Sequence, residues 1–295
     1  MTENEQELIG VRPAHYISLN GGSPLPVDGA VIDEAPACVS VNGAELATFM
    51  CTPRDLVELA LGFLYNEEII TGLADVRVWH LAKNRSCVDV WLHDMAYEPP
   101  RRAITTAGCG GGVTFDDLSA VHPPLASDLQ ATPEQLAALM RRLQVGAELY
   151  QAARGVHTAV LADPCAAREE ECFLLQMEDI GRHNCLDKLQ GAALLGGIAT
   201  RDRVLLSSGR ISSEMINKAR RLETPIVCSR TSPTGLSVAL AEAWNITIVA
   251  YLRQERMRIY THPERVLPNT DHRPQTTDRE QDENRRLSSV VSGLP

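Results

Sequence analysis

Short apolar runs alternate with amphipathic stretches through the second half of the chain. The runs predict strands at 156–162, 172–177, 204–207, 226–229 and 246–252, and the amphipathic stretches predict helices at 184–195, 212–222 and 233–244. The sequence Thr132-Pro-Glu-Gln135 is typical of a helix start and predicts a longer helix to about Tyr150. Strands that alternate with helices of this length predict a parallel or mixed sheet covered on both faces.

The first half of the chain has a different pattern. Strands are expected at 39–41 and 45–49, joined by the hairpin signal Asn42-Gly43, and again at 76–81 and 87–92. Thr52-Pro-Arg-Asp55 predicts a helix with Thr52 as N-cap, Pro53 at its first position and Asp55 as the acid of a capping box. The apolar stripe of this helix is Leu56, Leu59, Ala60, Phe63 and Leu64.

Two breaks in these patterns divide the chain. His122-Pro-Pro124 interrupts regular structure and separates an α+β domain at 13–125 from an α/β domain at 130–265. Residues 1–12 and 266–295 are polar and poor in apolar side chains, so we expect disordered tails there.

Composition and charge narrow the class of partner. No apolar run approaches membrane-spanning length and the first ten residues are acidic and polar, so we expect a soluble, cytosolic protein without membrane contact. The net charge of −10 argues against general nucleic-acid binding. Residues 201–265 nevertheless hold eleven Lys or Arg against six Asp or Glu. That local excess suits a phosphate-bearing small molecule, although a solvated face of scattered arginines fits the same count.

The eight cysteines follow neither a disulfide framework nor a zinc pattern. They stand at 38, 51, 87, 109, 165, 172, 185 and 228, and no two form Cys-x-x-Cys, so we expect no metal. Most lie in apolar runs and are expected in the core. Cys109 differs, because Ala107-Gly-Cys-Gly-Gly-Gly112 leaves its thiol without bulky neighbours. The stretch is either a flexible turn or a loop that presents a reactive thiolate.

Three further stretches follow strands at one end of the predicted sheet, where ligands of such sheets gather. Ser207 to Ser213 and Ser229 to Thr234 each join a strand to a helix through hydroxyl side chains and an arginine, which favours an anionic ligand. Asp179-Ile-Gly-Arg-His183 permits His183 as an acid or base oriented by Asp179. We favour the simpler interpretation, in which Asp179 or Asn184 caps the next helix and His183 bonds to a nearby carbonyl.

Taken together, these motifs resemble those of the FdhD/NarQ family of formate dehydrogenase accessory sulfurtransferases. The resemblance rests on Gly108-Cys-Gly110, Asp179-Ile-Gly-Arg-His-Asn-Cys-Leu-Asp-Lys188, Ser208-Gly-Arg-Ile-Ser212, Ser229-Arg-Thr-Ser-Pro-Thr234 and Tyr260-Thr-His-Pro-Glu-Arg265. These stand in the family's order and the resemblance covers residues 13–265.

The resemblance implies a fold and a function. The fold is α/β: a cytidine-deaminase-like three-layer α/β/α C-terminal domain, without the zinc, beside a smaller α+β N-terminal domain that carries the Cys109 loop. The function is sulfur delivery, in which a cysteine desulfurase loads a persulfide onto Cys109. The sulfur then passes to the molybdenum cofactor, bis(molybdopterin guanine dinucleotide), before that cofactor enters formate dehydrogenase. The cofactor-binding residues would be Tyr251, Leu252, Arg253, Gln254, Glu255 and Arg256, and family members are expected to be homodimers.

One position departs from the pattern of the family. Many members read Cys-Gly-x-Cys-Gly in the loop, and Gly112 stands at the second cysteine here. One thiol suffices in principle to accept a persulfide sulfur. The absent second thiol keeps an alternative open, in which the protein is a cofactor-binding chaperone that moves no sulfur. A cysteine hydrolase that uses Cys109 and His183 is a third hypothesis.

Overall fold

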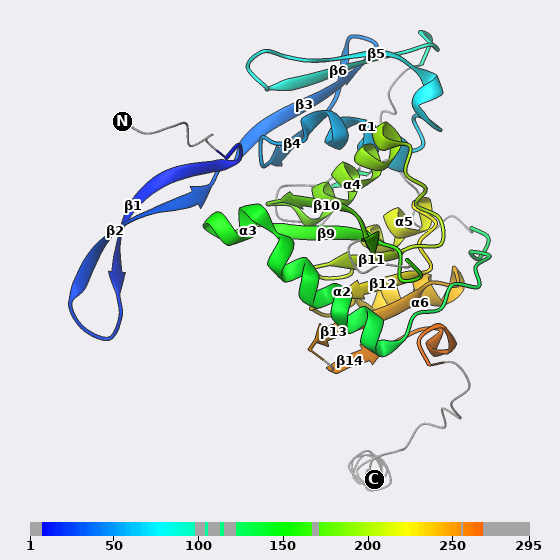
Figure 1. Cartoon of the computed structure of the whole chain (residues 1–295). Coiled ribbons are helices and arrows are strands. Elements are labelled where there is room, and N and C mark those ends of the chain that lie inside the picture. The colour runs from blue at the N-terminus through cyan, green and yellow to red at the C-terminus, as the bar shows by residue number, and fades with distance from the viewer. Residues whose placement is uncertain are drawn as a thin grey trace, which may run out of the picture.

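The computed structural model describes residues 8–97, 104–105, 113–114, 122–166, 171–254 and 256–267. Figure 1 shows three parts: an extended two-stranded ribbon, a small sheet with one helix, and a large sheet between helices. In the described residues the large sheet has the strand order β10-β9-β11-β12-β13-β14. Its strands are β9 (His157–Ala162), β10 (Phe173–Asp179), β11 (Val204–Ser207), β12 (Ile226–Ser229), β13 (Thr247–Arg253) and β14 (Arg256–Ile259).

The large sheet is mixed, as its pattern predicts. β11, β12 and β13 are parallel neighbours, whereas β9, β10 and β14 join them as antiparallel strands. Side chains from α4 (Arg182–Gly196), α5 (Ser213–Arg221) and α6 (Gly235–Ala243) form the core on one face. Side chains from α2 (Pro133–Gly146) form a second core on the opposite face. The expected cover of helices on both faces is therefore confirmed.

Two of the predicted helices need correction at their ends. Thr132 and Gln135 form the expected capping box at the start of α2. The helix does not run on to Tyr150, because the backbone of Ala147 is extended and a separate short helix, α3 (Glu148–Ala153), follows. Pro233 is not at the first position of α6 either, since Thr234 is the N-cap and bonds to Ser237.

The small sheet has the strand order β4-β3-β6-β5. Its strands are β3 (Ala35–Val41), β4 (Ala44–Cys51), β5 (Val76–Leu81) and β6 (Cys87–Leu92). A short 3-10 helix, Leu73–Asp75, precedes β5, and a second one, Pro263–Arg265, lies near the end of the described chain. The Asn42-Gly43 hairpin is confirmed, with both residues at positive φ. The predicted stripe of α1 (Leu56–Asn66) is buried against one face of this sheet.

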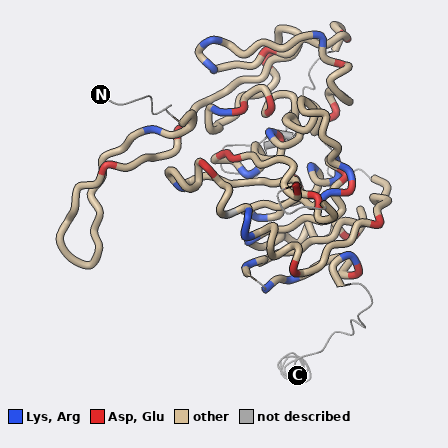
Figure 2. The backbone as a smooth tube through the Cα atoms, viewed as in Figure 1, with Lys and Arg blue, Asp and Glu red and all other residues tan. Residues whose placement is uncertain are grey.

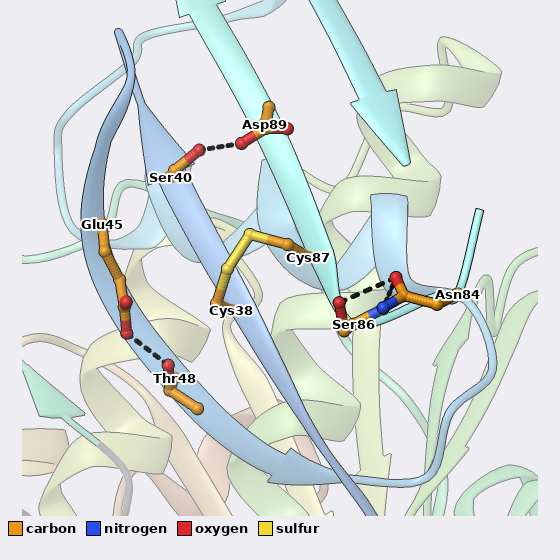
Figure 3. The surroundings of a disulfide bond; sticks show 8 residues. All are labelled: Cys38, Ser40, Glu45, Thr48, Asn84, Ser86, Cys87 and Asp89. Atoms are coloured by element: carbon orange, nitrogen blue, oxygen red, sulfur yellow. Dashed lines mark hydrogen bonds between the residues drawn. A yellow bond between two sulfur atoms is a disulfide. The ribbon is translucent and has the colours of Figure 1, made fainter. Parts of the chain in front are cut away.

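A disulfide joins Cys38 of β3 to Cys87 of β6 (Figure 3). The expectation that the cysteines form no disulfide framework does not hold for this pair. β3 and β6 are parallel neighbours, and their register places Cys38 directly opposite Cys87. The spacing of cysteines along the chain gave no sign of the bond, because that register arises from strands far apart in sequence.

The start of α1 also differs from the prediction. The helix begins at Leu56, and its N-cap Asp55 adopts a left-handed backbone with no side-chain capping bond. Thr52 does not cap it, because its polar groups bond instead to the large sheet and its helices, which we call the large unit. Its amide donates to Asp179, and its carbonyl accepts from Lys188. The tertiary contacts of Thr52 therefore override its local capping signal.

The small sheet and α1 form the small unit. α1 and α4 cross at very short range and so join the small unit to the large unit. A Cβ atom added to Gly62 of α1 would lie 1.7 Å from the backbone oxygen of Asp187. A Cβ added to Gly191 of α4 would lie 1.9 Å from the backbone oxygen of Glu58. Only glycine allows the helix backbones to approach this closely at the crossing.

The ribbon consists of β1 (Val11–Leu19) and β2 (Pro24–Ile32), paired antiparallel along their whole length. It extends away from both sheets, as Figure 1 shows, and only its base lies near α3. The sequence patterns did not predict it, and the expected disordered segment 1–12 overlaps β1 at Val11 and Arg12. We call this ribbon the arm.

Within the described residues, no helix is long and apolar enough to cross a membrane.

Candidate functional site

The carboxyl ends of β11, β12 and β13 meet at one edge of the large sheet. Ser207 ends β11 and lies opposite Ser229, which ends β12. β9 runs the other way and β10 runs in the same direction as β11, so His157 at the start of β9 and Asp179 at the end of β10, themselves paired, lie at the same edge. The sheet therefore gathers the motifs at Asp179, Ser207 and Ser229 where the sequence predicted them.

Three arginines line a cavity of about 560 Å³ at this edge, with Gln254 as the fourth lining residue. Arg253 and Arg256 face each other across the turn from β13 to β14, and Arg230 comes from the loop after β12. No carboxylate is among these four residues. Figure 2 shows the Lys and Arg positions around β14 in blue. Planar guanidinium groups suit a phosphate-bearing ligand.

Tyr251, two residues before Arg253, has an unusual backbone conformation. β13 has a bulge between Ala250 and Arg253, and Tyr251 within it has φ of 52°. A β-bulge redirects a side chain out of the regular alternation. The guanidinium carbon of Arg258 lies 4.5 Å from the centre of the Tyr251 ring. A planar ligand could therefore stack only on the other face of the ring.

The remaining predicted residues of this stretch differ in what they can offer. Leu252 is completely buried in the core against α2 and offers no exposed surface to a ligand. Arg253, Gln254 and Arg256 are exposed. Glu255 lies outside the described residues.

Cys109 also lies outside the described residues, but the structure describes both sides of its loop. β7 (Ile104–Thr105) and β8 (Val113–Thr114) pair antiparallel, with Thr105 opposite Val113. The chain therefore returns to its starting point across the seven residues 106–112 that contain Cys109.

Asp179 is the centre of a buried bonding network. One carboxylate oxygen accepts from the Lys188 ammonium at 2.6 Å and from the Thr52 amide at 3.1 Å. The other accepts from the Gly181 amide at 2.7 Å and from the Asn184 side chain at 2.8 Å. Neither Asp179 nor Asn184 is the N-cap of α4, which is Gly181 without a side-chain capping bond. Both capping interpretations are therefore wrong, and Asp179 connects the two units instead.

His183 has other partners than either interpretation predicted. Its Nε2 lies 3.2 Å from the Ser212 hydroxyl and its Nδ1 lies 3.2 Å from Glu214, both in the first turn of α5. Burial, followed by the positive charges of Lys218 and Arg182, lowers the pKa of His183 to about 2. An imidazole with this pKa is a weak base near neutral pH. Neither a hydrolase mechanism with His183 as its base nor an orienting role for Asp179 gains support.

His157 is a residue that sequence analysis missed. Its Nδ1 lies 3.3 Å from the Ser208 hydroxyl, and burial, followed by the positive charge of Arg182, lowers its pKa. Gly209 lies close beside it, because a Cβ there would be 3.3 Å from Nδ1 of His157. His157 begins a strand and belongs to no motif, so the pairing of β9 with β11 alone brings it to the site.

The two helix starts at this edge are already capped. The Ser212 hydroxyl accepts from the Met215 amide, and the Thr234 hydroxyl accepts from the Ser237 amide. The arginine-lined cavity therefore offers an anion more free donors than these helix N-termini do. Across the described part of the chain, no group of three or more His, Cys, Asp or Glu is placed to hold a metal ion.

The chain belongs to the FdhD/NarQ family, whose pattern it matches over residues 32–267. The match includes both sheets, the residues around Asp179 and the arginine-lined cavity. It also includes the glycine loop that contains Cys109. The motifs quoted from the sequence therefore identified the family correctly.

Curated relatives and a solved structure agree with this assignment. The chain is 35% identical over 251 residues to the sulfur carrier protein FdhD of Bacillus subtilis, covering 83% of this chain and 93% of that protein. It is 35% identical over 241 residues to the sulfur carrier protein FdhD of Staphylococcus aureus strain MRSA252, covering 80% and 89%. A crystal structure of a candidate formate dehydrogenase accessory protein from Desulfotalea psychrophila superposes with a TM-score of 0.70 at 26% identity, covering 87% of this chain and 99% of that one.

Proposed function

We propose that this protein is a sulfur carrier that serves formate dehydrogenase. Its curated relatives bear the name of a sulfur carrier, and the similar crystal structure is described as a formate dehydrogenase accessory protein. The observation that carries the proposal is the arginine-lined cavity, because it lies at the stretch 251–256 that the family resemblance assigns to the cofactor. A carrier needs such a site to hold the acceptor of its sulfur.

Cys109 carries the sulfur in this proposal. Its thiolate attacks the outer sulfur of a persulfide on a cysteine desulfurase, and the desulfurase cysteine leaves as a thiolate. Glycines on both sides leave the Cys109 sulfur open to two large partners in turn. The pairing of β7 with β8 supports this role, because it holds the two ends of the loop together.

The acceptor is the molybdenum cofactor, bis(molybdopterin guanine dinucleotide), as a substrate. Arg253 and Arg256 would bind its phosphates, with Gln254 and Glu255 beside them, while the buried Leu252 would support the stretch from the core. Arg230 extends the predicted set, since it lines the same cavity. The Tyr251 ring would stack on a guanine or pterin ring through the side away from Arg258. Three guanidinium groups around one cavity match the charge of a dinucleotide better than that of a neutral ligand.

The proposal includes the wider setting implied by the family. A cysteine desulfurase is the sulfur donor, formate dehydrogenase receives the cofactor, and the protein acts in the cytoplasm as a homodimer. We also propose the division into an α+β domain at 13–125 and a cytidine-deaminase-like three-layer domain at 130–265. The helices α4, α5 and α6 on one face of the large sheet, with α2 on the other, support the three layers.

The alternative is a chaperone that binds the cofactor and moves no sulfur. Gly112 motivates it, because a second loop thiol that could relay the persulfide is missing at that position. This alternative needs the arginine-lined cavity but not the thiol of Cys109.

Formate dehydrogenase activity in cells that lack their own carrier separates the two functions. The sulfur-carrier proposal predicts that Cys109→Ala abolishes the activity, and that the double variant Arg253→Ala, Arg256→Ala does so as well. The chaperone predicts that only the arginine variant loses it. Cys165→Ala, which removes an exposed free thiol elsewhere, is the matched control and should keep full activity.

A further inference from the structure

The Cys38–Cys87 disulfide lies on the face of the small sheet that is turned away from α1. Val39 of β3 and Val88 of β6 are buried in the core against α1. Side chains alternate between the two faces of a strand, so the neighbouring Cys38 and Cys87 point to the opposite face. Both cysteines are half-buried, and their disulfide is therefore within reach of solvent.

The side chains nearest the disulfide along this face are polar. Ser40 stands two positions after Cys38 on β3 and donates to the carboxylate of Asp89 on β6 (Figure 3). Thr48 of β4 is exposed and lies opposite Cys38. A dissolved thiol can therefore approach the two sulfur atoms across a polar, open surface.

This setting differs from that of the cysteines in the cores. Cys51, Cys185 and Cys228 are buried, and burial raises the pKa of each thiol. Because the thiolate is the reactive form of cysteine, these three thiols are inert near neutral pH. Cys38 and Cys87, in contrast, combine access to solvent with a second sulfur in bonding position.

The sheet holds the two cysteines together without help from the bond. β3 and β6 pair from Cys38 to Val41, and the Cys38 amide donates to the Ser86 oxygen at 2.8 Å. At the other end of this ladder, the Asn42 amide donates to the Val90 oxygen at 3.0 Å. The Cα atoms of the bonded pair are 4.4 Å apart, and the ladder keeps them close enough for the bond to re-form. The bond can therefore open and close while the strands stay paired.

The bond closes a long loop that contains much of the small unit. Cys38 and Cys87 are 49 positions apart, and β4, α1 and β5 lie between them. A disulfide stabilises a fold mainly because it restricts the unfolded chain, and a longer closed loop restricts that chain more. Oxidation of the pair should therefore stabilise the small unit, whose helix α1 crosses α4 of the large unit.

We propose that Cys38 and Cys87 are a redox-active pair, oxidised by low-molecular-weight disulfides and reduced by the corresponding thiols, and that oxidation stabilises the small unit. In the oxidation, one of the two thiolates attacks the small disulfide, a mixed disulfide forms, and one small thiolate leaves. The other cysteine thiolate then attacks the protein-bound sulfur atom of the mixed disulfide and displaces the second small thiolate. The protein loses two electrons and two protons, and the small disulfide gains both. Reduction runs the same steps in reverse.

The cellular role of the pair rests on the proposed function, whereas the exchange itself does not. In the cytoplasm proposed above, thiols are kept reduced, and the disulfides that form there are mostly transient and redox-sensing. The pair is then open under ordinary conditions and closes under oxidative stress, when the small unit gains stability.

The test equilibrates the folded full-length Cys109→Ala variant with mixtures of glutathione and glutathione disulfide at neutral pH. This variant lacks the thiol of the proposed sulfur carrier, so the result does not depend on that function. Alkylation with N-ethylmaleimide in denaturant, followed by intact-mass analysis, counts the free thiols. As the share of glutathione disulfide rises, two thiols should disappear together, and peptide mapping should locate them at Cys38 and Cys87.

Single variants provide the matched controls. Cys38→Ser and Cys87→Ser, each in the Cys109→Ala background, cannot complete the second step and should accumulate a mixed disulfide with one glutathione. Cys165→Ala in the same background removes an exposed thiol elsewhere and should keep the two-thiol transition. A pair that stays oxidised in excess glutathione and opens only in denaturant contradicts the proposal, because the bond is then purely structural. A pair that stays reduced in excess glutathione disulfide contradicts it as well.

Urea denaturation tests the consequence for stability. The oxidised form should unfold at a urea midpoint about 1 M higher than that of the reduced form. The double variant Cys38→Ser, Cys87→Ser should unfold at one midpoint, whether glutathione or its disulfide is present. Equal midpoints for the oxidised and reduced forms would show that the bond does not stabilise the small unit.

Discussion

The ammonium group of Lys188 lies 2.6 Å from the carboxylate of Asp179, and both side chains are completely buried. Lys188 also donates to the backbone oxygen of Thr52 at 3.2 Å, and Asp179 accepts from the amide of the same residue. Asp179 and Lys188 belong to the large unit, whereas Thr52 precedes α1 in the small unit. One buried ion pair therefore connects the small unit, which precedes the Cys109 loop in the sequence, to the edge of the large sheet where the arginine-lined cavity lies.

Removal of the Lys188 charge should destabilise the fold strongly. Lys188→Met leaves Asp179 buried without its counter-charge, and such a loss costs about 3–5 kcal/mol of unfolding free energy. Arg201→Met is the matched control, because Arg201 pairs with Glu223 at 3.4 Å while both are exposed, and its loss should cost within about 1 kcal/mol. Urea denaturation measures both values. Equal costs would show that the buried pair does not hold the units together.

The glycine crossing of α1 and α4 gives a second stability prediction. Gly62→Ala places a methyl group against the Asp187 carbonyl and must push the helices apart, at a cost of about 3 kcal/mol. Gly235→Ala, in a helix but with open space around its Cβ position, should cost nothing measurable. Thermal unfolding of the two variants distinguishes them. A Gly62→Ala variant as stable as the wild type would mean that the helices can separate freely.

Local sequence signals were sufficient for much of the fold. The strands at 76–81, 87–92, 204–207 and 226–229 have the predicted bounds, because short apolar runs between turn residues define them locally. The arm escaped prediction because its prolines and glycines obscure the alternation expected of strands. The Cys38–Cys87 bond escaped it because a parallel register between distant strands cannot be derived from spacing.

The site was only partly visible in the sequence. The motifs placed Arg253 and Arg256 at the correct sheet edge, since the order of strands and helices fixes where strand ends lie. The partners of His183 could not be predicted, because Ser212 and Glu214 reach it through the packing of α5 on α4. Thr52 was misassigned for the same reason: contacts across the two units outweigh its local capping signal.

Acid should destabilise the protein partly through His183. Its pKa is lowered to about 2 in the folded state, whereas an unfolded histidine titrates near 6.5. Between these values the unfolded chain binds one more proton, so stability falls as pH drops below about 6.5, by roughly 1.4 kcal/mol per pH unit. His183→Asn should remove this contribution between about pH 6 and 4. The exposed His80 gives the control His80→Asn, which should leave the slope unchanged, and identical slopes for both variants would contradict the prediction.

The arginine-lined cavity should bind diphosphates. Guanosine diphosphate serves as a probe for one end of the proposed cofactor, and calorimetry measures its affinity. Arg230→Ala or Arg256→Ala should each raise the dissociation constant by about 10- to 100-fold, the range for one charge-assisted bond. Arg77→Ala, on the exposed edge strand β5, is the control and should bind as the wild type does. Wild-type affinity in all three variants would place the ligand elsewhere.

The central claim is that Cys109 carries sulfur, and intact-mass analysis after incubation with a cysteine desulfurase and cysteine tests it most directly. The wild type should gain the mass of one sulfur atom, which dithiothreitol should remove, and Cys165→Ala should gain the same. Cys109→Ala should gain nothing. An equal gain in the wild type and in Cys109→Ala, or no gain in either, would contradict the assignment of the sulfur to this cysteine.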